Sequence, residues 1–348
     1  MTATSPDLDH DVLRGRQAVL ARFEDLAARH HHLAPTASGA WLRAALDAAP
    51  ATSVWAVVMP GAAVVLHDRI GDQGRRSELL TGGGGHLAGV AASSPAAAWW
   101  LGAALAREAD ARGSGLHLTE LPDDPAVAAL ADGAGAVVTR GVPVPYVLRP
   151  LPGEQLVSAG VRKNLRKTHN RLATDGVAMD ISITADAATF EAALPDLETA
   201  YRDRDEAHGV ACALDTPWGR RTWLGRLRAL ADLPTQACRR ELGVLRLDGE
   251  VAAYVVGLRQ GERYGIYDGR FRTRWARYSP GRLLEHAVLR HAFDQPGVQL
   301  VDWMTGVAPE TLLCVSGYAD RLAVDRPAAG GPQAAEARPA MNEAHNRA

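Results

Sequence analysis

One stretch of the chain combines the features of an anion-binding site. Residues 277–283 follow a strand-like run that ends near Tyr267, and a proline and a glycine open the apolar-periodic helix that comes next. The N–H groups of a first helical turn point outward, and the helix dipole adds partial positive charge. The pattern predicts a pyrophosphate site, although a plain Ser-Pro-Gly helix start fits the same residues. The predicted contacts are Tyr267, Arg277, Tyr278, Ser279, Pro280, Gly281, Arg282 and Leu283.

Acidic residues stand at the ends of two predicted strands. Asp268 ends one and Asp302 another, and a parallel split of a sheet would bring both to the same opening. Either could act as a general base or orient an acceptor, or could instead cap a loop by accepting backbone N–H groups. Glu206 and His208 end a predicted helix and are further base candidates, although charged residues at helix ends are commonly only solvated.

A basic run lies upstream of these residues. Arg162 with Arg166 and Lys163 with Lys167 form like-charge pairs at i, i+4 spacing, and Arg171 follows. Such pairs weaken an isolated helix, which favours a compensating anion. We therefore expect Arg162 and Arg166 to contact a phosphate of a donor or acceptor; a solvated helix face with acidic partners elsewhere is the alternative.

Cysteine and histidine patterns argue against metal and covalent chemistry. Cys212, Cys238 and Cys314 are odd in number, far apart and without CxxC spacing, so they predict neither a disulfide framework nor a zinc site. None has an identifiable activating base beside it. The consecutive histidines 30–32 point in different directions and lack the i, i+4 spacing of a helical metal site. We expect no metal and a reducing, cytoplasmic location.

Composition sets further limits. At 348 residues the chain exceeds the usual size of one core, so two domains are expected. A net charge of −2 gives no global basic field, which argues against DNA binding. Residues 87–106 are free of charge, but they are mostly alanine, and a helix starting at Pro95 is favoured over a membrane span.

Periodicity in the second half predicts the order βααβββαβαβ. The hairpin signals Asp248-Gly249 and 260–262 join three strands into a meander, and one strand–helix–strand crossover follows, which together give a mixed sheet with helices on its faces. The expected strands are 177–183, 235–247, 251–259, 263–268, 298–303 and 318–324, and the expected helices are 186–208, 215–232, 280–293 and 309–315.

The first half repeats this order, which favours two tandem domains of the same α/β type. It has expected helices at 12–32, 39–47, 95–111 and 124–131 and expected strands at 52–59, 62–67, 75–80, 115–120 and 136–139. Gly82–Gly85 takes the place of the candidate loop but has no cation, so a degenerate repeat is expected. The predicted division is a disordered N-terminus 1–10, a degenerate domain 11–150, a catalytic domain 151–326 and a disordered tail 327–348.

Three segments carry a resemblance to a known family. Residues 160–177, 245–292 and 298–306 resemble the GNAT acyltransferases, in particular the cellulose-biosynthesis-type subgroup, which is related to Fem-type aminoacyl transferases. The most specific elements are the pair Tyr267-Asp268, the run 278–284 and the pair Asp302-Trp303 near Gly306. Two departures stand out: Glu310 and Thr311 replace a frequent Tyr-Lys pair, and the loop 277–284 has one glycine where the GNAT signature has two.

The resemblance implies a tandem GNAT fold and transfer of an acyl group from acyl-CoA, or from an acyl carrier protein, to the amine of a small molecule or peptide. Asp268, Asp302, Glu206 or His208 would supply the base, Tyr318 would protonate the leaving thiolate, and Trp303 would contact substrate. The alternatives are a Fem-type transferase that uses aminoacyl-tRNA and an inactive GNAT-like binding module. The sequence does not predict an oligomeric state.

Overall fold

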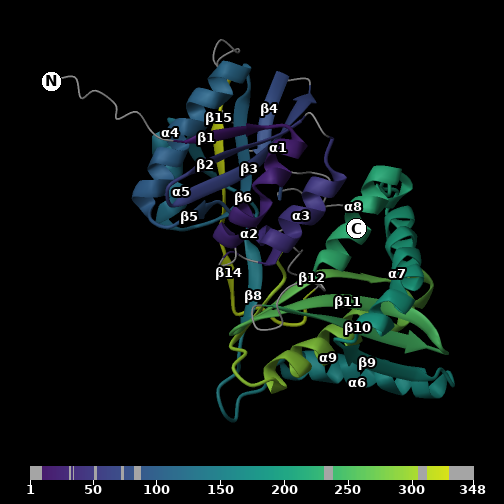
Figure 1. Cartoon of the computed structure of the whole chain (residues 1–348). Coiled ribbons are helices and arrows are strands. Elements are labelled where there is room, and N and C mark those ends of the chain that lie inside the picture. The colour runs from purple at the N-terminus through teal and green to yellow at the C-terminus, as the bar shows by residue number, and fades with distance from the viewer. Residues whose placement is uncertain are drawn as a thin grey trace. The chain divides into compact units, whose positions relative to one another are not determined.

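The computed structural model describes residues 10–30, 33, 35–50, 53–71, 74–81, 88–230, 238–304 and 312–328. The chain divides into two compact units. Unit 1 consists of Met1–Pro143 and Asp320–Ala348, and unit 2 consists of Val144–Ala319. Figure 1 labels helices and strands of both units.

Unit 1 is a mixed sheet with helices on both faces. Its strand order is β1-β2-β3-β4-β6-β15-β7, with the short β5 paired to β3, and only β4 and β6 run parallel. The elements are β1 (Asp11–Arg14), α1 (Arg16–Ala21), α2 (Phe23–Arg29), η1 (Pro35–Ala37), α3 (Gly39–Ala48), β2 (Val54–Met59), β3 (Ala62–Gly71), β4 (Gly74–Leu79), β5 (Ala91–Ala92), α4 (Pro95–Arg112), β6 (Gly115–Pro122), α5 (Pro125–Ala134), β7 (Val137–Arg140) and β15 (Arg321–Arg326).

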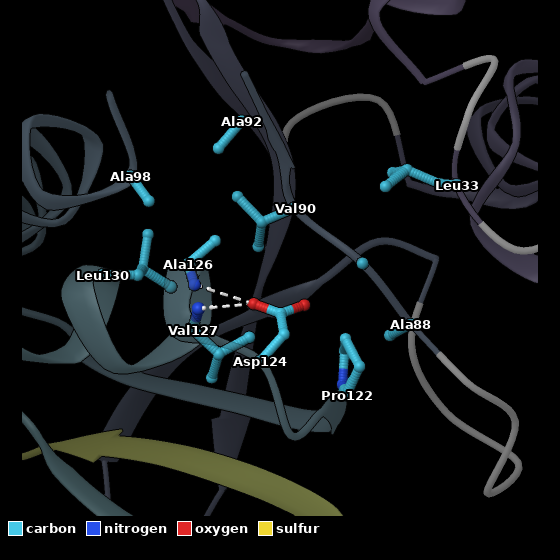
Figure 2. A pocket seen from close by; sticks show the side chains of 11 residues that line it. Leu33, Ala88, Val90, Ala92, Ala98, Pro122, Asp124, Ala126, Val127 and Leu130 are labelled. Carbon is cyan, nitrogen blue, oxygen red and sulfur yellow. Dashed lines mark hydrogen bonds between the residues drawn. The ribbon is translucent and has the colours of Figure 1, made fainter. Parts of the chain in front are cut away.

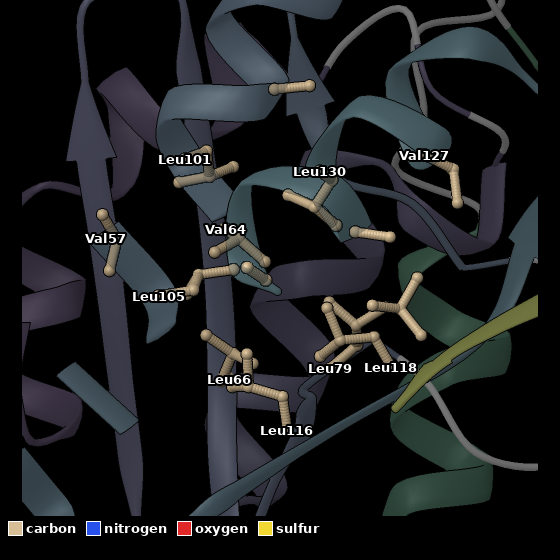
Figure 3. Packing of buried hydrophobic residues seen from close by; sticks show 14 of the residues in the cluster. Val57, Val64, Leu66, Leu79, Leu101, Leu105, Leu116, Leu118, Val127 and Leu130 are labelled. Atoms are coloured by element: carbon tan, nitrogen blue, oxygen red, sulfur yellow. The ribbon is translucent and has the colours of Figure 1, made fainter. Parts of the chain in front are cut away.

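The core of unit 1 has two layers because alternate residues of a strand face opposite sides of a sheet. In β2, Trp55 and Val57 pack toward α4 and α5, whereas Ala56 and Val58 pack toward α1–α3. Figure 3 shows the first layer, in which Leu101 and Leu105 of α4 meet apolar side chains of the sheet. α4 and α5 approach closely because Gly102 lies against the Leu130 carbonyl, where an added Cβ would come within 2.1 Å.

Unit 2 has the same plan. Its strand order is β14-β8-β13-β12-β11-β10-β9, and only β12 and β13 run parallel. The elements are β8 (Val144–Leu148), α6 (Ala159–Thr174), β9 (Met179–Thr184), α7 (Ala187–Ala207), η2 (Ala213–Asp215), α8 (Pro217–Ala229), β10 (Arg239–Leu247), β11 (Glu250–Gln260), β12 (Arg263–Phe271), η3 (Thr273–Tyr278), α9 (Pro280–Asp294), β13 (Leu300–Asp302) and β14 (Gly317–Ala319).

The sheet of unit 2 lies between two pairs of helices. α6 and α9 cover one face and α7 and α8 the other (Figure 1). In β11, Ala253 and Val255 pack on the α6–α9 side, so the alternation sends Tyr254 and Val256 to the α7–α8 side. The meander forms as expected, and the turn between β10 and β11 has positive φ at both Asp248 (50°) and Gly249 (82°), as a type I′ hairpin requires.

One strand of the first sheet is encoded after the whole of unit 2, and one inner strand of the second sheet is encoded at the start of unit 2. β15 lies between β6 and β7 in unit 1, although it follows the whole of unit 2 in sequence. β8 lies between β13 and β14 in unit 2, although it directly follows the last N-terminal strand of unit 1. The predicted α/β class with two mixed sheets is confirmed, but residues 320–326 complete the first sheet rather than the second.

Several expected elements differ from the observed ones. The first expected helix begins instead with β1, because Val12 pairs with Val57 of β2. The expected last strand is two strands, β14 and β15, in different sheets. Leu312–Val315, the described part of the expected helix 309–315, are not helical. The glycines 82–85, residues 305–311, 1–9 and 329–348 lie outside the described residues.

Candidate active site

The parallel strands of unit 2 separate after a short paired stretch. β12 pairs with β13 only from Arg263 to Gly265, opposite Leu300 to Asp302, and β12 then continues to Phe271. The backbone N–H of Trp303, the residue that follows β13, donates to the carbonyl of Pro145 in β8 and not to β12. The carboxyl ends of parallel strands are where open α/β sheets bind ligands. We define this opening as the split.

A β-bulge lies on the edge of the split. Val256 of β11 pairs with Asp268, but its neighbour Gly257 pairs with Ile266, which leaves Tyr267 as the extra residue of β12. Bulges locally break a ladder and re-aim side chains, and they are frequent beside active sites. Tyr267 is buried, and burial raises the pKa of its phenol.

Asp268 is the centre of a buried polar network. Its Oδ2 accepts hydrogen bonds from the Tyr254 hydroxyl at 2.9 Å and from Trp223 Nε1 at 3.3 Å. Its Oδ1 lies 2.9 Å from an Arg270 guanidinium nitrogen. The Asp268 side chain is only 8% exposed, so this carboxylate is compensated by a cation and two neutral donors in a region of low dielectric constant.

α7 presents one of its faces to this network. Tyr201, Arg204 and Asp205 lie at i, i+3 and i+4 on the same side, and the Arg270 guanidinium lies 4.6 Å from the centre of the Tyr201 ring. Asp203 accepts from both the backbone N–H and the hydroxyl of Thr273, which fixes α7 to the segment after β12.

The two base candidates on α7 do not join the network. Glu206 is exposed, and the exposed His208 ring places Nδ1 2.8 Å from the Arg204 carbonyl oxygen. Glu206 and His208 therefore remain predicted base candidates, and the α7 side chains near Asp268 are ones that the sequence analysis did not select. The sequence signal for these side chains was the i, i+4 spacing of Tyr201 and Asp205, which places both on the apolar side of the helix.

The N-terminus of α9 lacks the side-chain cap that the other long helices have. Ser279 occupies the N-cap position with φ 47° and makes no side-chain capping hydrogen bond. Within the described ranges, every other helix of ten or more residues has a side-chain N-cap; the capping residues are Ser38, Ser94, Asp124, Ser158, Asp186 and Thr216. In the first turn of α9 the Arg282 N–H donates to the Ser279 carbonyl at 3.1 Å, and the Gly281 N–H is the one left for an external acceptor of hydrogen bonds.

Other residues of the predicted loop hold it in place. The Asp175 carboxylate pairs with Arg277 and accepts a 2.8 Å hydrogen bond from the Tyr278 hydroxyl, which raises the pKa of Tyr278. Arg171 of α6 donates to the Arg277 carbonyl at 2.6 Å. Tyr278, Pro280 and Leu283 are buried. Arg277 thus has an internal carboxylate partner, and Arg282 is the half-buried cation of the first turn.

Asp302 marks the point where the strands separate. Its Oδ2 lies 2.7 Å from Arg263 Nε, and its Oδ1 accepts a 2.9 Å hydrogen bond from the Met304 backbone N–H. These are the contacts of a residue that fixes a turn, which was one of the two expected roles. The neighbouring Trp303 is buried in the core that α6 and α9 cover.

Glu285 is an acidic residue that sequence reasoning did not select. It lies in the second turn of α9, only 8% exposed, and its Oε1 accepts a 2.9 Å hydrogen bond from the Leu313 backbone N–H. Burial raises the pKa of this carboxyl to about 7, while the Leu313 N–H and Arg282 act in the opposite direction. An acidic residue in an otherwise apolar helical stripe was the signal.

Three predicted residues lie on elements other than β12, β13 and α9. Arg162 donates to the Val157 carbonyl at 2.7 Å, and Arg166 is exposed on α6. Tyr318 lies on the edge strand β14, which β8 and β13 separate from β12. Neighbouring strands are about 4.8 Å apart, so Tyr318 starts roughly 14 Å from the bulged strand.

Unit 1 has a cavity of about 80 Å³ at the corresponding side of its own parallel pair. Figure 2 shows apolar side chains around it, with the carboxylate of Asp124 as the acidic member of the lining. Asp124 Oδ1 accepts from the N–H groups of Ala126 and Val127 and so caps α5 internally. The described lining residues contain no cation, in keeping with the absence of an Arg or Lys from the Gly82–Gly85 run.

The described residues contain neither a metal-binding cluster nor a membrane-spanning helix. No group of three or more His, Cys, Asp or Glu side chains there could hold a metal ion. Among the same residues, no helix has both the length and the apolar character needed to cross a membrane.

Comparisons with known proteins agree with this geometry. Residues 159–310, which lie within unit 2, match the family described as acetyltransferase (GNAT) domain. Unit 2 therefore contains a GNAT-family domain. No curated protein matches the sequence of the chain.

Solved structures show a similar fold over most of the chain. FemX is 10% identical with a TM-score of 0.56, and covers 88% of this chain and 96% of its own. A C-terminal domain (DUF2156) from Agrobacterium fabrum is 14% identical with a TM-score of 0.53, covering 87% and 92%. A conserved protein of unknown function from Bacteroides thetaiotaomicron is 13% identical with a TM-score of 0.53, covering 88% and 97%.

Proposed function

We propose that the chain is an N-acyltransferase that moves an acyl group from the thioester of coenzyme A, or of an acyl carrier protein, to the amine of a small molecule or peptide. The observation that carries this proposal is the first turn of α9, which has no side-chain cap and follows, after η3, the bulged end of β12 that has separated from β13. A helix N-terminus binds phosphate, and a sheet split admits an extended ligand beside it.

The proposed roles follow from the chemistry of thioester aminolysis. The pyrophosphate lies against Gly281 and Arg282, and the thioester carbonyl lies beside the bulge, where a backbone N–H near Tyr267 stabilises the oxyanion. The amine loses a proton and attacks the carbonyl carbon, the C–S bond breaks, and the thiolate leaves and takes up a proton. Asp268 orients the incoming amine or accepts its proton through the buried network.

A second donor is favoured by one observation on α6. Lys163, Arg166 and Lys167 are exposed, and the helix contains no acidic residue. Such a face suits the phosphates of an aminoacyl-tRNA, the donor of a Fem-type transferase. Salt dependence distinguishes the two donors, because RNA binding falls steeply with added salt whereas thioester binding at one helix N-terminus depends on few charges.

Ligand-induced stabilisation tests the donor. Acetyl-CoA, a long-chain acyl-CoA and free CoA are added to the full chain, and the unfolding midpoint is measured; saturation at a hundred times Kd stabilises by about 2.7 kcal/mol, a shift of several degrees. Gly281→Val should abolish the shift while the protein stays folded, because a Cβ at Gly281 would meet only Phe271 Cδ1 at an ordinary 3.5 Å.

A matched control is available at the N-terminus of another helix. Gly160 holds the same second position in α6, where Ser158 caps the helix. Gly160→Val should leave the ligand shift intact. A wild-type chain that shows no shift with any of the three compounds would rule out coenzyme A as the donor carrier.

A further inference from the structure

Gly281 and Glu285 lie on one face of α9, in its first two turns. They are i, i+4 neighbours and stand about 6 Å apart along the helix axis. Because the Cα–Cβ bonds of a helix tilt toward its N-terminus, the side chain of Glu285 leans over the turn that contains Gly281. Ser279 provides no side-chain cap there, and the Gly281 N–H makes no hydrogen bond within the described ranges. A carboxyl group and an available N–H therefore share one side of the helix.

The order of the elements places this face of α9 at the split. α9 connects the parallel strands β12 and β13, so its first turn lies at their carboxyl ends. The segment after β13 begins at the same edge, and Leu313 of that segment donates its N–H to Glu285 Oε1 at 2.9 Å. At the β12 side, a Cβ at Gly281 would meet Phe271. Contacts from both sides of the split thus converge on the face of α9 that holds Gly281 and Glu285.

One oxygen of the Glu285 carboxyl group is left for a ligand. The residue is 8% exposed, and Oε1 is occupied by the Leu313 N–H. Oε2 makes no hydrogen bond in the described part of the chain, yet it does not belong to the side-chain atoms there that are both fully buried and unpaired. Oε2 is therefore an unpaired oxygen that a ligand can still reach, and a hydrogen-bonding group of that ligand would replace its lost hydration.

We infer that Glu285 Oε2 shares a hydrogen bond with the pantoyl hydroxyl of the donor's 4′-phosphopantetheine arm, while the Gly281 N–H binds the phosphate at the start of that arm. The inference rests on the proposed function and names a specificity residue for its donor. The hydroxyl is the first polar group after the phosphate, at a distance comparable with one helical turn. Coenzyme A and acyl carrier proteins share this arm, and aminoacyl-tRNA lacks it.

A hydroxyl suits a carboxyl group that lies beside a phosphate. The charge of the phosphate disfavours a second negative charge close by, and burial already raises the pKa of Glu285 to about 7. A hydroxyl can donate to a carboxylate and accept from a carboxylic acid, whereas an amide N–H can only donate. The contact therefore forms with either protonation state of Glu285.

Binding of two probes to the full chain tests the inference without requiring turnover. The probes are 4′-phosphopantetheine and its analogue in which hydrogen replaces the pantoyl hydroxyl, so they differ in one group and share the phosphate. Calorimetry or ligand-observed NMR gives both affinities. We expect the hydroxyl compound to bind roughly fivefold to tenfold more tightly than the analogue, the usual effect of one hydrogen bond.

Variants then assign the hydroxyl contact. Glu285→Met should lower the affinity for 4′-phosphopantetheine to that for the analogue and leave the affinity for the analogue unchanged. Glu285→Gln should recover most of the loss, because its amide group can still hydrogen bond to a hydroxyl and to Leu313. Gly281→Val should weaken both compounds equally, since both contain the phosphate. Glu262→Met, in the exposed turn between β11 and β12, is the matched control and should change neither affinity.

The outcomes separate this inference from the proposed function. Equal affinities of the two probes in the wild type, binding of neither probe, or equal losses for both probes in Glu285→Met would overturn the Glu285 contact. If Glu285→Met fails to fold, Glu285→Asp replaces it, because the shorter acid also withdraws from the hydroxyl. Thioesters that shift the unfolding midpoint, together with equal probe affinities, would overturn only the contact. Probes bound through Glu285 without a shift by any thioester would overturn coenzyme A and leave the carrier protein as donor.

Discussion

The Tyr254 hydroxyl and the Asp268 carboxylate face each other across β11 and β12, with the phenol donating to Oδ2 at 2.9 Å. Tyr254 is 1% exposed, and its burial together with the negative charge of Asp268 raises the pKa of the phenol well above its ordinary value. The phenol therefore remains a protonated donor at every pH at which an amine is acylated. This contact fixes the direction in which the carboxylate faces the split.

Replacement of Asp268 tests its role. Asp268→Asn should lower kcat/KM by about a hundredfold or more, the usual effect of losing a proton-transfer group, and Tyr254→Phe should lower it about tenfold by removing one charge-assisted hydrogen bond. Steady-state release of free thiol from acyl-CoA measures both. Asp294→Asn, at the exposed end of α9, should change little. Equal rates for Asp268→Asn and Asp294→Asn would remove Asp268 from the mechanism.

Glu285 should make the protein less stable as the pH rises. Its folded-state pKa of about 7 lies above the ordinary value of 4.5, so the folded form binds a proton more tightly than the unfolded form. Stability therefore falls between about pH 4.5 and 7 and stays low above that range. Glu285→Gln keeps an acceptor for the Leu313 N–H and removes the buried charge.

The stability difference between Glu285→Gln and the wild type should be near zero at pH 4.5 and grow by pH 8 to on the order of 2–3 kcal/mol. Urea unfolding at several pH values measures it. Glu262→Gln, in the exposed turn between β11 and β12, serves as the control and should show no such trend. A pH-independent difference would contradict the burial of an ionisable group at position 285.

His117 should also contribute stability that is lost as the pH rises, but over a higher pH range. Its Nδ1 lies 2.5 Å from Asp325 Oδ1, across β6 and β15, and this hydrogen bond raises the pKa of the imidazole. The contribution is fully present below the unfolded-state pKa near 6.5 and is lost as the pH rises through the higher folded-state value. His117→Gln should therefore lower the urea midpoint at pH 6 and change it much less at pH 9.

The partner residue supplies the check on that prediction. Asp325→Asn should lower the midpoint at pH 6 by a similar amount, and the double variant should lose little more than either single one. Additive losses would show that the two side chains act independently.

Removal of β15 should unfold unit 1. A chain that ends after Ala319 keeps every strand of unit 2 but loses the partner that lies between β6 and β7. Native-state hydrogen exchange should then show lost protection in β6 and β7 and retained protection in β10–β12. A chain that ends after Ala328 keeps β15 and should behave as the full chain does; equal protection in both truncations would contradict the strand assignment.

Local patterns in the sequence predicted much of the architecture. Alternation and turn residues predicted β10–β12 and the Asp248-Gly249 hairpin, and Pro280 predicted the start of α9. These features could be predicted because they depend on neighbouring residues. The placement of Asp268 and Asp302 at the two sides of a parallel split also followed from element order. The family resemblance is confirmed at the level of the GNAT domain, whereas the cellulose-biosynthesis-type subgroup remains a prediction.

The rest depended on contacts between distant parts of the chain. Val12 fits a helical pattern locally, but its pairing with Val57 decides that it is a strand. The partners of Asp268 come from β11 and α8, and the bulge at Tyr267 is a property of register, which a single strand does not encode. Position in the chain also suggested that the expected strand 318–324 would close the second sheet, whereas β15 pairs in the first.

The placement of β15 has a consequence for synthesis on the ribosome. Residues 144–319 must be made before the strand that belongs between β6 and β7 exists, which at ordinary elongation rates takes roughly 10 to 40 s. During that interval the edges of β6 and β7 that β15 will pair with are open in unit 1. The strand β8 of unit 2, in contrast, is synthesised before the rest of its sheet. The half of the chain that emerges first is therefore the half that folds last.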